Sequence, residues 1–118
     1  MRIPDRIKIL DQIIKITWND RYCTKEGVLG QSNLSFNEIM LCHKYDGREI
    51  PQEKINQTFF HELSHFIMYI MRREKLVHDE TFVDNLGTVL CNIMLNNDFK
   101  GEKENEGKIK AKRKTGTR

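Results

Sequence analysis

Cysteine is scarce in this sequence, with three residues among 118 at widely spaced positions: Cys23, Cys42 and Cys91. An odd number of distant cysteines argues against a disulfide framework and predicts unreactive thiols in a reducing compartment. The sequence also lacks a run of roughly 18 to 20 apolar residues, which a membrane-spanning helix needs. Because its first residues show no apolar segment typical of a secretory signal, we expect a cytoplasmic protein with no membrane partner.

The remaining composition fits one small domain followed by a basic tail. Apolar residues make up 38% of the chain, which suffices for one modest core but not for a second domain. Residues 100–118 contain eight Lys or Arg and three Glu, a net charge of +5, whereas residues 1–99 have a net charge of −2. We therefore predict a folded domain over residues 1–99 and a disordered tail over residues 100–118.

The first half of the domain is typical of short β-strands. Strands are expected over residues 6–18, 28–36 and 38–43, with a polar loop over residues 19–27 and a turn near Gly47. The Ile-rich first segment predicts either one bulged strand or two short strands, because its apolar alternation changes phase halfway along.

The second half is typical of two helices, over residues 52–73 and 79–96. Apolar residues recur in both at helical spacing, and no Gly or Pro interrupts the first. Asp79 is expected to cap the second helix, and the small residues Gly87 and Cys91 are expected to let it approach the first closely. The apolar stripe expected on the second helix consists of Phe82, Val83, Leu86, Val89, Leu90, Ile93 and Met94. The sequence thus predicts an α+β fold, a small, mainly antiparallel twisted sheet packed against two principal helices.

The segment His61-Glu62-Leu63-Ser64-His65 is an H-E-x-x-H motif on the first of these helices. Residues four apart on a helix are neighbours, so the two imidazoles can bind one metal ion. The intervening Glu62 projects to the same side and can take a proton from a metal-activated water molecule. This pattern indicates a Zn²⁺ site with Glu62 as general base.

A catalytic zinc site needs a third protein ligand and one open position. We predict Glu80 as that ligand, with His78, in the preceding loop, as its rival. Asp84 is four residues after Glu80 and can accept the second ring N–H of a ligating histidine. Tyr69 and His78 are the two candidates for an oxyanion-stabilising residue, and the sequence does not choose between them.

The segments Gln57–His65 and Asp79–Gly87 resemble small phage- and prophage-associated zinc peptidases related to the ImmA/IrrE group of the zincins. The resemblance covers roughly residues 27 to 95. It implies that His61, His65 and Glu80 bind zinc, as in gluzincins, that Glu62 is the general base and that Asp84 supports a ligand. It further implies an edge strand near the zinc where a peptide substrate pairs, for which the expected strand over residues 38–43 is the candidate.

We therefore predict a zinc metallopeptidase that hydrolyses a peptide or protein substrate. The resemblance suggests one regulatory protein of a phage or mobile element as the substrate. The alternative is a non-catalytic zinc-binding module, or a nucleic-acid-associated regulator that acts through the basic tail. Retention of Glu62 favours the enzyme, because a purely structural zinc site needs no general base.

Overall fold

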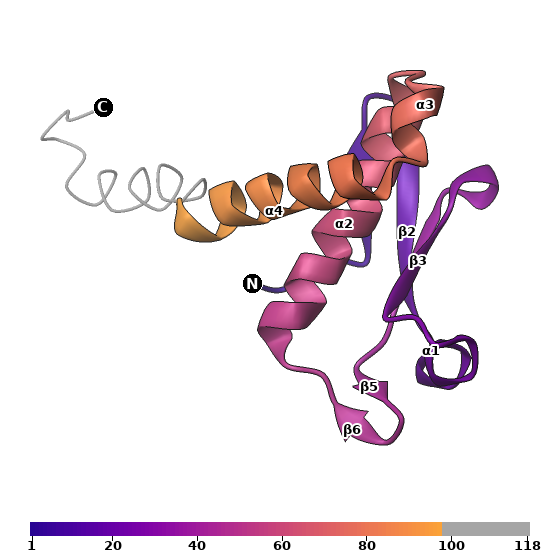
Figure 1. Cartoon of the computed structure of the whole chain (residues 1–118), viewed down its shortest axis with the longest axis vertical. Helices are drawn as coiled ribbons and strands as arrows, with labels where there is room; N and C mark the ends of the chain where they lie inside the picture. The colour runs from indigo at the N-terminus through magenta and orange to yellow at the C-terminus, as the bar shows by residue number, and fades with distance from the viewer. Residues whose placement is uncertain (98–118) are drawn as a thin grey trace, which may run out of the picture.

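A computed structural model describes residues 1–97, in which a mostly antiparallel sheet packs against one of two long helices (Figure 1). The elements are, in chain order, β1 (Arg6–Ile9), β2 (Gln12–Trp18), α1 (Asp20–Glu26), β3 (Gly30–Asn33), a 3₁₀ turn (Leu34–Phe36), β4 (Glu38–Leu41), β5 (Lys44–Tyr45), β6 (Arg48–Glu49), α2 (Gln52–Ile70), α3 (Glu74–Val77) and α4 (Glu80–Asn96). The predicted α+β class, with two principal helices, is confirmed.

The main sheet has the strand order β1-β2-β4-β3. The pairs β1–β2 and β3–β4 are antiparallel, and β2 and β4 are parallel, with Ile16 opposite Ile39. Parallel neighbours need a crossover connection, and here α1 and β3 form it. Residues 6–18 fold as two strands that reverse at Leu10, whose φ of 55° is left-handed. The structure therefore selects the second of the two predicted alternatives.

The prediction of a loop over residues 19–27 is wrong, because these residues form the helix α1. The Asn19 side chain accepts a hydrogen bond from the backbone N–H of Tyr22 and caps its first turn. Gly27 ends the helix in the left-handed conformation, with φ of 71°, and donates its N–H to the Cys23 carbonyl. Both caps are visible in the sequence, although the seven-residue helix between them has too little apolar periodicity to be recognised.

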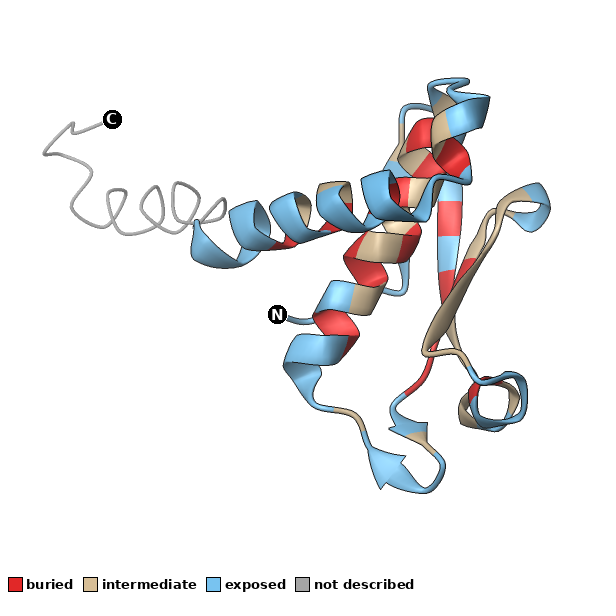
Figure 2. Cartoon of the chain, viewed as in Figure 1, coloured by how far each residue is buried: buried red, intermediate tan, exposed pale blue. Residues whose placement is uncertain are grey.

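Each face of the sheet has its own apolar core. One face packs on α2 through the buried side chains of Ile14, Ile16, Ile39, Leu41, Phe59 and Phe66. On the other face, Met40 forms a smaller cluster with the buried thiols of Cys23 and Cys42. Figure 2 shows the buried residues concentrated where α2 meets the sheet. The first core fixes α2, and with it the H-E-x-x-H motif, against the sheet.

The two predicted long helices are present, with different ends and a different apolar surface. The first ends at Ile70, and the chain turns through Arg72, whose φ is 58°, into α3. In α4, Asp79 accepts the Phe82 N–H as the predicted cap. The predicted apolar stripe is only partly buried: Val83 is covered, but Val89, Ile93 and Met94 are exposed. The reason is that the second half of α4 extends past α2 (Figure 1).

Within residues 1–97, no helix is both long enough and apolar enough to cross a membrane. The tail predicted over residues 100–118 lies outside the described residues, so its predicted disorder stays a prediction.

Candidate metal centre

The H-E-x-x-H motif lies in the middle of α2, where the helix contacts the sheet on one side and α4 on another. The phenyl ring of Phe66 faces the sheet core, whereas the imidazoles of His61 and His65 face the start of α4. Their side chains are only 22% and 13% exposed. Because the apolar residues of α2 recur at helical spacing, the helix has one apolar face toward the core and a separate polar face.

The histidines and Glu80 form a compact cluster of potential ligands. His61 Nε2 lies 3.1 Å from Glu80 Oε1, and His65 Nε2 lies 3.4 Å from Glu80 Oε2. One ligand atom from each residue lies within 4.8 Å of the others. Bonds of about 2.1 Å to a tetrahedral zinc ion place ligand atoms roughly 3.4 Å apart. The spacing of the cluster therefore suits an ion of that size.

The second nitrogen of each imidazole faces an oxygen acceptor. His65 Nδ1 lies 2.7 Å from the backbone carbonyl of Val77 in α3, and His61 Nδ1 lies 3.3 Å from Asp84 Oδ1 in α4. Because a carbonyl only accepts, His65 Nδ1 carries the proton in this bond, which leaves the Nε2 lone pair directed at Glu80. Such contacts orient metal-ligating histidines in proteins.

The chemistry of this donor set fits a divalent cation. A neutral imidazole has a single N–H, yet in both His61 and His65 each ring nitrogen faces a carbonyl or carboxylate oxygen. The Nε2 lone pairs would therefore oppose the Glu80 carboxylate unless a proton or a cation lay between them. Two imidazoles and one carboxylate are a ligand set that zinc prefers, with a fourth position left open.

Gly87 brings α4 close enough to α2 for Glu80 and Asp84 to reach the histidines. A methyl group built on Gly87 would lie 2.9 Å from the His61 Cα and 3.0 Å from the Phe60 carbonyl oxygen. Backbone atoms cannot move aside as a flexible side chain does, so only glycine permits this helix contact. The close approach expected from the sequence is confirmed at Gly87.

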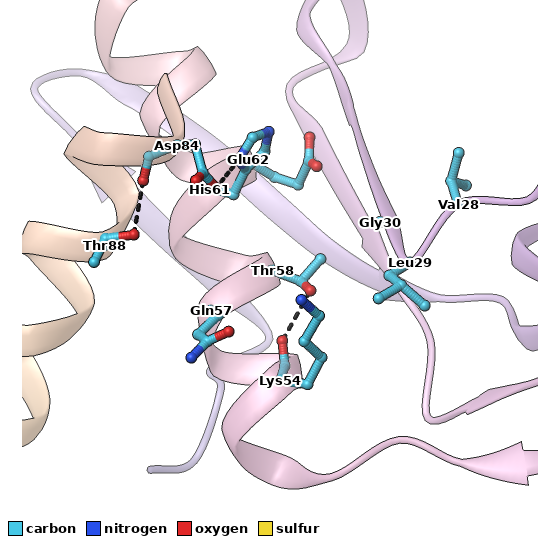
Figure 3. Close-up of a pocket in the computed structure, with 10 residues that line it drawn as sticks. All are labelled: Val28, Leu29, Gly30, Lys54, Gln57, Thr58, His61, Glu62, Asp84 and Thr88. Carbon is cyan, nitrogen blue, oxygen red and sulfur yellow. Dashed lines mark hydrogen bonds and ion pairs between the residues drawn. The ribbon is translucent and has the colours of Figure 1, made fainter. Parts of the chain in front are cut away.

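Glu62 lies beside the cluster at a groove of about 460 Å³. The groove runs between α2, the start of α4 and residues 28–30, and Figure 3 shows the Glu62 carboxylate directed toward the β3 side. Glu62 is 9% exposed, and Ser32 Oγ donates a hydrogen bond to its Oε1 over 2.7 Å. The groove is therefore lined by the potential base Glu62 together with one potential ligand, His61, and its partner Asp84.

The structure brings together four of the predicted site residues in one cluster: His61, His65, Glu80 and Asp84. The rival ligand His78 is exposed at the C-terminal end of α3 and is not a member of that cluster. Ligation and catalysis themselves stay predictions. Sequence reasoning missed Ser32 and the Val77 carbonyl, because a serine on a strand and a backbone oxygen carry no motif.

The expected edge strand over residues 38–43 is wrong in position. The strand found there, β4 (Glu38–Leu41), pairs with β2 on one side and β3 on the other, so its backbone has no free edge. The sheet edge next to the groove is β3, which begins at Gly30, one of the groove-lining residues 28–30. Local patterns do not give strand order, which depends on long-range pairing.

The α+β fold and the His-His-Glu cluster define a class of protein with a candidate divalent-metal centre. The chain belongs to the SprT-like family, whose model matches residues 6–105. Proteins of this family are zinc metallopeptidase-like. A search of curated proteins and a search of solved structures gave no match.

Proposed function

We propose that the protein is a zinc-dependent peptidase, with His61, His65 and Glu80 as metal ligands and Glu62 as general base. The observation that carries this proposal is the convergence of two Nε2 atoms and one carboxylate, with one of the ligands, His61, lining a groove next to Glu62. The family match supports the same reading, because it covers the α2 motif and α4 together.

When bound, zinc lowers the pKa of a water molecule and polarises a substrate carbonyl. The Val77 carbonyl and the Asp84 carboxylate hold the two imidazoles with their Nε2 atoms directed at the Glu80 carboxylate, and these three residues would hold the zinc ion. Glu62 Oε2, the oxygen that Ser32 does not occupy, takes the proton of the attacking water and delivers it to the leaving amine. Neither Tyr69 nor His78 is assigned as an oxyanion donor.

The groove also offers a way to place an extended peptide. Among residues 1–97, β3 ends the sheet and pairs only with β4, so the other side of its backbone can pair with a substrate strand. Hydrogen bonds between main chains form whatever side chains the substrate carries. A substrate strand paired in this way would place its scissile carbonyl at the ligand cluster, beside Glu62. A peptide or protein segment that is already extended is therefore the substrate that we propose.

Metal content tests the ligand set. Protein purified without chelator is compared by elemental analysis for the wild type, His61→Ala, Glu80→Gln and His78→Gln. We expect about one zinc per chain in the wild type, as in other three-ligand catalytic sites. The ion should be lost in His61→Ala, weakly held in Glu80→Gln and retained in His78→Gln. Retention in Glu80→Gln with loss in His78→Gln would transfer the third-ligand role to His78.

Cleavage of fluorescein-labelled casein, an unstructured protein, tests catalysis. Glu62→Gln should keep its zinc and lose cleavage, since the amide cannot take the proton. Equal cleavage by the wild type and Glu62→Gln would contradict the assignment of the base. A zinc-loaded wild type that cleaves no unstructured protein would favour the non-catalytic zinc module.

The kinship with ImmA/IrrE peptidases, and with them a regulatory protein of a phage or mobile element as substrate, remains a hypothesis from the sequence resemblance. It is tested by incubating the zinc-loaded protein with candidate regulators and looking for a single cut that Glu62→Gln does not make.

A further inference from the structure

Ser32 joins the edge strand of the sheet to the predicted base. It lies in β3, opposite Ile39 of β4, and its hydroxyl donates to Glu62 Oε1 over 2.7 Å. The same Oγ lies 2.8 Å from the Glu62 backbone carbonyl. A hydroxyl has one hydrogen, and a carboxylate is the stronger acceptor, so the bond to Oε1 is favoured.

This contact is the one hydrogen bond to the Glu62 carboxylate among residues 1–97. A mostly buried carboxylate needs donors to replace the water that it has lost. A glutamate side chain otherwise has three rotatable bonds, and catalysis loses efficiency when a reacting group is misplaced by about 1 Å. The bond occupies Oε1, and no described residue forms a hydrogen bond with Oε2.

We propose that Ser32 is a positioning residue for Glu62. Its hydroxyl fixes one carboxylate oxygen on the sheet edge, so that the other faces the groove in a constant orientation. This inference rests on the proposed function only for its consequence in turnover, because the restraint on the side chain exists with or without a substrate. Ser32, which holds the base, thus lies in β3, the same strand that we propose for pairing with the substrate.

The first test measures the restraint itself. In zinc-supplemented protein labelled only at glutamate, NMR relaxation gives the order parameter of the Glu62 side-chain methylenes, with the signal identified by its absence in Glu62→Gln. We expect the order parameter to fall in Ser32→Ala and to be restored in Ser32→Thr, which keeps a hydroxyl. Ser35→Ala serves as the control, because Ser35 lies in the 3₁₀ turn beyond β3. An unchanged order parameter in Ser32→Ala overturns the proposal, whatever the activity.

The second test measures turnover of labelled casein. Ser32→Ala should lower kcat by roughly 10- to 100-fold, in line with misplacement of a catalytic group, with KM and zinc content unchanged. Ser32→Thr should recover most of the loss. In a Glu62→Gln background, Ser32→Ala should have no further effect, because the base is already absent. Loss of zinc or of the fold in Ser32→Ala would show a merely structural role and overturn the proposal. If the wild-type protein does not cleave casein, the proposed function is contradicted but the positioning role of Ser32 is not. The order parameter of Glu62 still tests that role.

Discussion

At the scale of single residues, the site depends on groups that direct the histidines as much as on the histidines themselves. Asp84 could be predicted, because it follows Glu80 by one helical turn and so shares its face. Ser32 and the Val77 carbonyl could not, because each reaches the motif from an element distant in sequence, 30 and 12 residues away. The sequence thus predicts the ligands and the base, whereas the orientation of their side chains depends on contacts that only the fold provides.

Substitution of Asp84 by Ala should weaken metal binding without unfolding the protein. The change removes the acceptor 3.3 Å from His61 Nδ1, and loss of such a partner typically costs 10- to 100-fold in metal affinity. Competition with a zinc-chelating dye measures the change. Asn85→Ala, at the neighbouring exposed position, is the control and should bind as the wild type does. Equal affinities in both variants would contradict the role of Asp84.

The thiol of Cys42 should resist alkylation in the native protein. Burial, followed by its contact with Cys23, raises the Cys42 pKa to about 12. Only roughly one thiol in ten thousand is then ionised at pH 8, and the thiolate is the reactive form. Iodoacetamide labelling followed by mass spectrometry should therefore find Cys42 unmodified in native protein and modified in urea. Rapid labelling of Cys42 without denaturant would contradict this environment.

At the scale of elements, the sequence predicts the helices whose apolar pattern repeats over several turns. It misses the elements that are stabilised by caps and tertiary contacts. α2 and α4 have several turns of apolar residues, so their positions follow from pattern alone. α1 has seven residues, is too short to be stable by itself and depends on its caps and on the cluster around Cys23. The place of β4 inside the sheet depends on pairing with β2 across a crossover, which no local pattern contains.

Gly87→Ala should separate α2 from α4. Alanine favours helices by roughly 1 kcal/mol over glycine. Here, however, its methyl group would lie 2.9 Å from the His61 backbone, and overpacking of this kind costs typically 1–3 kcal/mol. We therefore expect a net loss of up to about 2 kcal/mol in the free energy of unfolding, measured in urea, together with weaker zinc binding. Asn92→Ala, at an exposed position of α4 that does not line the groove, is the matched control. A more stable Gly87→Ala would show that the helices can move apart at no cost.

At the scale of the whole molecule, a metal at this cluster would connect α2 with α4, two elements separated by α3. A ligand that binds only the folded state stabilises it by about 2.7 kcal/mol at 100 times its Kd. Zinc should therefore raise the melting temperature of the wild type by several degrees, and a chelator should reverse the effect. His65→Ala should melt at the same temperature with and without zinc. An equal shift in the variant would place the bound ion elsewhere.

The bond between His65 and the Val77 carbonyl has a consequence for how the site tolerates change. Every amino acid at position 77 supplies the same backbone oxygen, so substitutions there disturb packing but leave the acceptor in place. A deletion or insertion between α2 and α4 would move that oxygen, although it alters no site residue. Single substitutions at position 77 will therefore not reveal the role of this hydrogen bond. Changes in the length of the segment between α2 and α4 will reveal it.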